Sequence, residues 1–356
     1  MSQVNPSVTP GPSHNRKTVF FAVLFLVIAV AGLMYVKWWP YYHKMLAAAS
    51  THSIGASILG DADTSSSPSW ANTWKYAEAY FLAIWKAAIL GVVLGSLIQV
   101  LLPSQWLLRV LGKTSFGSTA IAGLAAVPGM MCTCCAAPMA VGLRKKNASV
   151  GSSLAFWLGN PTINPATLIF MTFVLSWKFT LIRLVFGLVL TFGVSYLANR
   201  FAKNTEPVNI DKLIKNKETE AQDSFIVRWG KSIGSMILYL VPAYFLSVLI
   251  VSAARVWLFP HISAGASNNI WMIVFFAIAG MIFVIPTAAE IPIIQTFITF
   301  GLGTGPAAAL LLTLPSISLP SLIMVGRSFP KRVLFFVVVS VVVLGILSGL
   351  VGMFIL

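Results

Sequence analysis

The residues of this chain best suited to chemistry are three cysteines, Cys132, Cys134 and Cys135, which are all the thiols it has. They lie in the apolar segment 128–138, which has a proline at each end. Thiolates bind soft ions such as Cu(I), Hg(II) or trivalent arsenic, whereas a structural zinc site would need further ligands elsewhere. We therefore predict that all three thiols contact a passing soft substrate, with Cys132 and Cys134 as its transient metal or metalloid ligands. The alternative is that the cysteines only pack as small apolar side chains.

Glu290 is the only acidic residue in the apolar segment 230–356. A carboxylate inside a membrane is costly, so it is expected to be paired, protonated or functional. We predict that Glu290 couples transport to proton movement. The two basic residues within apolar segments, Lys86 and Arg183, are its candidate partners.

Prolines interrupt the apolar segments at recurring places, above all in 160–165 and 314–320. Each proline removes a backbone donor, and the freed carbonyls are tolerated in a membrane only against protein or a water-filled cavity. Helix breaks are predicted at Pro128, Pro138, Pro161, Pro165, Pro286, Pro292, Pro315 and Pro320. The polar side chains beside them are predicted to bind substrate: Asn160, Asn164, Ser316 and Ser318. Simple kinks without a binding role are the alternative.

The interrupted segments form an internal repeat. Residues match at a constant offset of 154: Gly151 with Gly305, Pro138 with Pro292, Pro161 with Pro315, and Ile163 with Ile317. The cysteine segment therefore has a counterpart in 285–292, which contains Glu290. Paired segments interrupted by proline and glycine are typical of transporters whose binding site lies at the interface between repeats.

The composition indicates that membrane-spanning helices position these residues. Of 356 residues, 58% are hydrophobic and only 9% are charged, against about a quarter in soluble proteins, and the mean hydropathy is +0.87. Several apolar windows are long enough to cross a bilayer: 18–36, 76–102, 179–198, 231–251 and 333–356. The sequence predicts an all-α polytopic membrane protein.

The net charge of +15 does not indicate nucleic-acid binding, because the basic residues are scattered in short loops. If 115–143 and 270–300 are re-entrant hairpins, most of these residues fall on the cytoplasmic face together with the N-terminus, as the positive-inside rule requires. Lys37 is then among the few on the outer face. The hairpins would enter from opposite faces, which makes the repeats inverted. Two fully spanning segments are the alternative, and they fit the charge bias less well.

The predicted organisation has six parts. They are a disordered tail at 1–15, a peripheral N-terminal transmembrane helix at 16–42, an outer loop at 43–75, repeat one at 76–200, a charged cytoplasmic linker at 201–229 and repeat two at 230–356. The Trp/Tyr cluster at 38–42 is expected at the level of the lipid headgroups.

A combination of motifs resembles the bacterial predicted-permease family that includes the ArsP-type organoarsenical exporters. The residues that carry the resemblance are Pro128, Cys132, Cys134, Pro138, the segment 142–151, Pro161, Asn164 and Pro165. The resemblance implies a multi-pass permease of the bacterial inner membrane, and some members export trivalent organoarsenicals. Cys135 and Asn160 depart from the family pattern, so the resemblance assigns them no role.

The favoured hypothesis is a secondary transporter, not an enzyme, that moves a small thiophilic substrate and carries no resident cofactor. The chain has no Walker motif for nucleotide hydrolysis. One alternative is a thiol–disulfide carrier that works with a thioredoxin-like partner, although near-adjacent cysteines close disulfides with difficulty. Another is an uptake permease for a small sulfur oxyanion, bound at helix N-termini. A homo-oligomer is compatible with each hypothesis.

Overall fold

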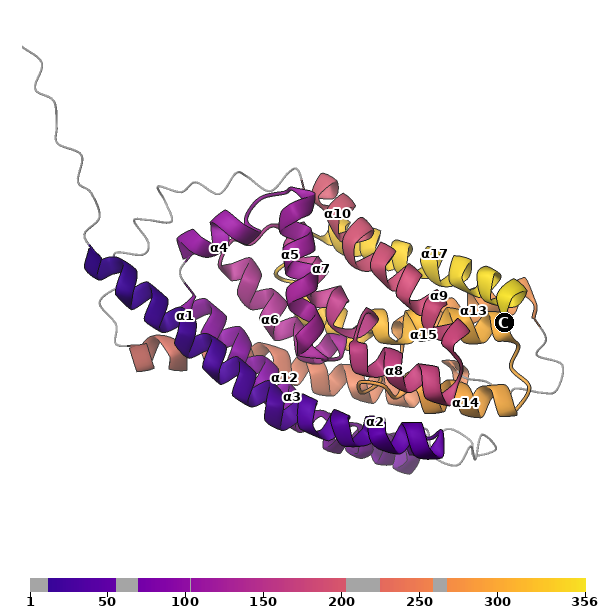
Figure 1. The fold of residues 1–356 in the computed structure, drawn as a ribbon. Coiled ribbons are helices and arrows are strands. Elements are labelled where there is room, and N and C mark those ends of the chain that lie inside the picture. Colours follow the sequence, from indigo (N-terminus) through magenta and orange to yellow (C-terminus); the bar gives the residue numbers. More distant parts are fainter. Residues whose placement is uncertain (1–11, 56–69, 103, 203–224, 259–267) are drawn as a thin grey trace, which may run out of the picture.

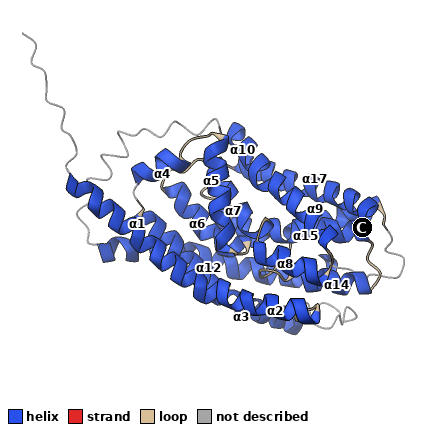
Figure 2. Ribbon diagram, in the orientation of Figure 1, coloured by secondary structure: helices blue, strands red, loops and turns tan. Residues whose placement is uncertain are grey.

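The computed structural model describes residues 12–55, 70–102, 104–202, 225–258 and 268–356. Every regular element in these ranges is a helix (Figures 1 and 2). The N-terminal elements are α1 (Pro12–Leu33), the π-helical turn η1 (Met34–Trp38) and α2 (Trp39–Thr51). The prediction of an all-α protein is confirmed.

The remaining elements fall into two series. The first comprises α3 (Trp70–Leu101), α4 (Ser104–Leu111), α5 (Phe116–Ala126), η2 (Val127–Gly129), α6 (Thr133–Lys145), α7 (Val150–Thr162), α8 (Pro165–Val174), α9 (Trp177–Leu188), η3 (Val189–Val194) and α10 (Ser195–Phe201). The second comprises α12 (Phe225–Leu258), α13 (Ile270–Ile282), α14 (Glu290–Thr299), α15 (Thr304–Ser316), α16 (Leu319–Val325) and α17 (Lys331–Ile355).

Five helical segments in the described ranges are long and apolar enough to cross a membrane: Val19–Thr51, Thr73–Leu101, Trp177–Phe201, Thr304–Val325 and Lys331–Ile355. A sixth joins Gln105–Leu111 to Phe116–Gly129 across a bend of 106°. The predicted window 231–251 lies within α12. The chain is therefore a multi-pass membrane protein.

The two series repeat the same packing. Helix α7 packs against α5, α6 and α10, just as α15 packs against α13, α14 and α17. One contact between a glycine and a threonine occurs in both series at the offset of 154, but the two residue types have changed places. Gly159 on α7 faces Thr191 on η3, whereas Thr313 on α15 faces Gly345 on α17. The internal repeat of the sequence thus corresponds to a repeated set of helix contacts.

The cysteine segment and its counterpart around Glu290 are both hairpins, in which two helices are joined by a break. In each hairpin the two ends lie close together. The backbone N–H of Ser149, after α6, donates to the carbonyl of Leu111, before α5, at 2.7 Å. The N–H of Gly305, after α14, donates to Oδ1 of Asn268, before α13, at 2.9 Å. We call α5–η2–α6 the thiol hairpin and α13–α14 the acid hairpin.

The open ends of the two hairpins lie at opposite ends of two neighbouring helices, the continuous helix α9–η3–α10 and α17. The pair is antiparallel, since Lys178 at the start of α9 donates to the carbonyl of Ile355 at the end of α17 (Figure 1). The thiol hairpin opens beside the end of α10, where Gly151 N–H donates to Asn199. The acid hairpin opens beside the end of α17, where Thr304 donates to the carbonyl of Gly352. Inverted repeats require such an arrangement, and their insertion from opposite membrane faces stays a prediction.

The N-terminal region differs from the expectation. The helix continues past 42 to Thr51, and α3 already begins at Trp70, so much of the expected outer loop is helical. The predicted tail is helical from Pro12, and α12 begins at Phe225 within the predicted linker. Residues 1–11, 56–69 and 203–224 lie outside the described residues.

Lys37, which the charge pattern assigns to the outer membrane face, is buried among the helices with 5% of its surface exposed. Most of the described residues of α1 and of α2 are exposed. The π-turn η1 shifts the helical register, which turns Lys37, Trp38 and Tyr41 toward the other helices. Trp39 and Tyr42 of the same cluster stay exposed.

Two of the predicted helix breaks are not breaks. Helix α6 runs through Pro138, and Pro292 lies in the first turn of α14. Glycines on α3 explain why α6 continues through Pro138. Gly91 and Gly95 lie so close to α6 that a Cβ atom at either would collide with the carbonyl of Cys135 or Pro138. This tight packing supports the backbone around the proline, as neighbouring helices commonly do in membranes.

Candidate functional site

The break in the thiol hairpin sets the start of α6. Pro128 lies in η2, and Met130 adopts a left-handed conformation with φ 49°. The indole of Trp38 donates to the carbonyl of Pro128 at 2.8 Å, and that of Trp157 donates to the carbonyl of Thr133 at 2.9 Å. These bonds tie the break to η1 and α7. Cys132 is the N-cap of α6.

The start of α6 decides which thiols meet. Residues three apart share one face of a helix, and the Sγ atoms of Cys132 and Cys135 lie 3.0 Å apart. The Sγ of Cys134 points elsewhere and lies 3.4 Å from Oγ of Ser318 on the other repeat. The close thiol pair is therefore Cys132 and Cys135, and not the expected Cys132 and Cys134. The described residues contain no group of three His, Cys, Asp or Glu side chains that could hold a metal ion.

The acid hairpin has a longer break, from the end of α13 to Glu290. Ala288 adopts a left-handed conformation with φ 70°, and Tyr76 donates to the carbonyl of Val284 at 2.8 Å. Glu290 is the first residue of α14. A negative charge is favoured there by the helix dipole.

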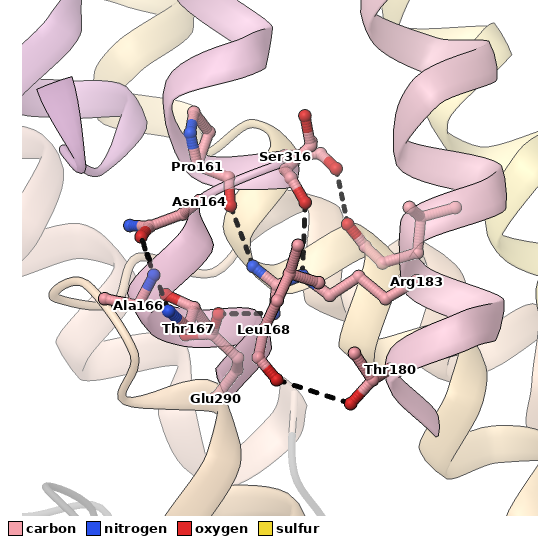
Figure 3. Close-up of polar contacts among 11 residues, drawn as sticks. Pro161, Asn164, Ala166, Thr167, Leu168, Thr180, Arg183, Glu290 and Ser316 are labelled. Carbon is pink, nitrogen blue, oxygen red and sulfur yellow. Dashed lines mark hydrogen bonds and ion pairs between the residues drawn. The ribbon is translucent and has the colours of Figure 1, made fainter. Parts of the chain in front are cut away.

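Glu290 forms a buried ion pair with Arg183 of α9, on the other repeat. Arg183 Nη1 lies 2.6 Å from Glu290 Oε1, and each side chain is 1% exposed. Arg183 also donates to the carbonyls of Pro161 at 2.8 Å and Thr162 at 3.4 Å, where α7 ends (Figure 3). Of the two expected partners, Arg183 is thus the one that meets Glu290. Lys86 is exposed and lies near the rings of Tyr35 and Trp85.

The two proline-rich segments place equivalent N-caps at the broken helices. Asn164 Oδ1 accepts from the backbone N–H of Ala166 at 3.1 Å and of Thr167 at 3.4 Å, which caps α8 (Figure 3). Ser318, at the matching position, caps α16 in a reciprocal capping box with Ser321. These residues stabilise the breaks themselves.

The other predicted polar residues are buried beside the breaks. Asn160 donates to the carbonyl of Phe156 at 2.8 Å, while its Oδ1 has no hydrogen-bond partner among the described residues. The same holds for Nδ2 of Asn164. Ser316 bonds to the carbonyl of Leu312 in its own helix.

A small cavity of about 10 Å³ lies between the two hairpins. It is lined by Cys132, Thr133, Pro161, Thr167, Ile285, Pro286, Thr287, Ala288, Glu290, Leu314, Pro315 and Ser318. A cavity of this size holds about one water molecule, so a larger ligand needs the helices to move. A thiol and a carboxylate line the same cavity, and both Oε2 of Glu290 and Oγ1 of Thr167 lack partners within the described part of the chain.

Sequence reasoning missed Lys37, Thr287 and Thr167. Lys37 Nζ donates to Tyr41 Oη at 3.1 Å and to Thr287 Oγ1 at 3.0 Å. Thr287 lines the cavity together with Cys132 and Glu290. One signal was present, because Lys37 and Tyr41 lie four residues apart and so share a helix face.

Comparisons with known proteins identify the family of the chain. A family described as predicted permease, ArsP_1, matches residues 123–354. The chain belongs to this permease family. The UPF0718 protein YraQ of Escherichia coli (strain K12) is 51% identical to the permease over 330 residues, which cover 92% of this chain and 93% of that protein. The UPF0718 protein MJ0584 of Methanocaldococcus jannaschii is 20% identical over 297 residues, covering 64% and 81%. No solved structure matches the permease.

Proposed function

We propose that this permease moves a small thiophilic substrate and that Cys132 and Cys135 are its ligands. The observation that carries the proposal is the 3.0 Å separation of their Sγ atoms beside the cavity between the repeats. Trivalent organoarsenicals and soft metal ions are the substrate class that such a thiol pair suits. Export through the bacterial inner membrane, with the N-terminus in the cytoplasm, is the direction that the family resemblance favours.

A pair of thiols binds a trivalent organoarsenical in a balanced exchange. Two Cys S–H groups replace two As–OH groups, two As–S bonds form, and two water molecules leave. With a metal ion the thiols release protons instead. Glu290 lines the same cavity, its Oε2 has no partner among the residues that the structure describes, and it can accept a proton. Protonation of Glu290 would weaken its ion pair with Arg183, and this ion pair joins the two repeats. Substrate binding and proton binding would therefore both affect the interface between the repeats.

Transport of phenylarsine oxide into everted membrane vesicles tests the role of the thiols. Cys132→Ala and Cys135→Ala should each abolish uptake, because one thiol cannot replace the chelating pair. Cys134→Ala is the matched control and should retain most uptake, since its Sγ points to Ser318. Full uptake without Cys132 and Cys135 would refute the proposal.

A pH-gradient assay in proteoliposomes tests Glu290. Glu290→Gln should retain arsenical binding but lose the stimulation of transport by a proton gradient, because the amide cannot carry the proton. Glu78→Gln alters an exposed carboxylate on α3 and serves as control. Equal stimulation of wild type and Glu290→Gln would exclude Glu290 as the coupling residue.

The geometry also favours a second candidate, thiol–disulfide exchange. Cys132 and Cys135 have Cys-x-x-Cys spacing at a helix N-terminus, where thiols are reactive. The difficulty of closing a disulfide applies to nearer neighbours and not to this spacing. The dithiol would pass two electrons and two protons to a partner disulfide through a mixed disulfide. With Cys135→Ala, thioredoxin that keeps only its attacking cysteine, loaded as the mixed disulfide with thionitrobenzoate, should become trapped on Cys132 with release of thionitrobenzoate; transport activity with no trapped complex would favour the permease mechanism alone.

A further inference from the structure

The buried charges of the permease do not balance. Lys37, Arg183 and Glu290 are the buried charged side chains in the described ranges, with 5%, 1% and 1% of their surfaces exposed. Arg183 pairs with Glu290, and this is the one ion pair that the described residues form. Lys37 therefore has no carboxylate partner among them. Counted over the lysine, arginine and carboxylate side chains that the structure describes, the buried charges sum to one positive charge.

Neutral groups hold the Lys37 ammonium in place. It donates to the hydroxyls of Tyr41 and Thr287, and it lies 5.0 Å from the centre of the Tyr41 ring. Hydroxyls and an aromatic face orient a cation, but they supply no negative charge. A buried charge without a counter-ion is unfavourable, so an incoming anion would gain from the contact.

The surroundings of Lys37 lead to the cavity. Its partner Thr287 lines the cavity, as does Cys132. Cys132 is the N-cap of α6, and its side chain does not cap the helix. The first N–H groups of a helix lack partners within it and favour anions. Thr167 adds a buried hydroxyl to the same cavity, and this hydroxyl has no partner in the described ranges.

We propose that the permease binds thiol-reactive molecules that carry one negative charge, and that Lys37 forms the anion subsite with Thr287 and the first turn of α6. The soft atom of the ligand binds Cys132 and Cys135, and its anionic group neutralises the excess charge. This inference rests on the proposed function. It also makes the N-terminal helix, through Lys37, part of the binding site.

Two probes of nearly equal size separate the subsite from the thiols: phenylarsine oxide, which is neutral, and 4-carboxyphenylarsine oxide, which is anionic. Binding is measured as arsenic retained by the full-length purified permease in nanodiscs, by elemental mass spectrometry. In wild type the anionic probe should bind more tightly than the neutral one. Lys37→Met should weaken binding of the anionic probe roughly tenfold or more, because a charge-assisted contact is lost. The neutral probe should bind as in wild type, which also shows that the variant is folded.

Lys37→Arg should keep the preference for the anionic probe, since it keeps the cation. Lys44→Met, which removes an exposed charge from the same helical segment, should leave both affinities unchanged. Equal binding of both probes to wild type and Lys37→Met would overturn the anion subsite while leaving the thiol ligands standing. Failure of both probes to bind wild type, or equal binding to Cys132→Ala, would overturn the proposed function and the subsite with it.

Discussion

The two hairpins share a backbone plan but not their chemistry. At the offset of 154, Thr133 corresponds to Thr287 and both line the cavity. The other positions differ: Cys132 corresponds to Pro286, Cys134 to Ala288, Cys135 to Ala289 and Ala136 to Glu290. Thiols are confined to one hairpin and the acid to the other. The repeat therefore accounts for two similar breaks in the helices. The residues that differ between the breaks place thiols on one side of the site and a carboxylate on the other.

The ion pair shows the same asymmetry. Arg183 corresponds to Val337, which is fully buried, and Glu290 corresponds to Ala136. Only one arginine–carboxylate contact therefore exists where two-fold symmetry among the described helices would allow two. It joins α9 of repeat one to α14 of repeat two. The charged contact is a feature of the interface and not of either repeat.

The largest stability effect should come from breaking this asymmetric contact. Arg183→Met leaves Glu290 buried without a partner and should cost about 3–5 kcal/mol. The double variant R183M/E290M has apolar residues at both positions, so it should recover a large part of the lost stability. Thermal unfolding of the purified permease measures both. Arg200→Met, an exposed arginine on α10, is the control; an R183M variant as stable as this control would show that the pair does not hold the repeats together.

A smaller effect tests whether the repeats are equivalent in packing. Gly159→Thr brings a side chain against Thr191 and Ala126 and should destabilise by about 1–3 kcal/mol through overpacking. Adding Thr191→Gly and Ala126→Gly recreates the arrangement of Thr313, Gly345 and Gly280 in the second repeat. The triple variant should regain most of the lost unfolding temperature. A triple variant less stable than Gly159→Thr would contradict the equivalence.

The smallest effect concerns the two N-caps. Asn164→Ala and Ser318→Ala should each cost about 1 kcal/mol, because each removes the acceptor for the first N–H groups of a broken helix. Ser235→Ala on the exposed surface of α12 should change little. Unfolding temperatures in detergent compare the three variants. A loss at only one cap would show that the two breaks are stabilised differently.

The sequence predicted the local features well. Long apolar windows identified the helices because membrane thickness fixes their length. Prolines at 161, 165, 315 and 320 mark the ends and starts of helices, since a missing N–H matters most in a helix interior. Pro138 misled this prediction, because α6 is supported there by the glycines of α3, and those lie far away in the sequence.

The contacts within the site could not be derived from composition or spacing alone. Arg183 and Glu290 are 107 residues apart, and Lys37 and Thr287 are 250 apart. The choice between Lys86 and Arg183, and the inward turn of Lys37, depend on how distant helices pack and on one π-turn. Even the close thiol pair required the start of α6 to be known. The sequence by itself determined the kinds of chemical group and the breaks that carry them, because these are local properties. Only the tertiary structure decided which groups meet, because that depends on packing between segments the chain keeps far apart.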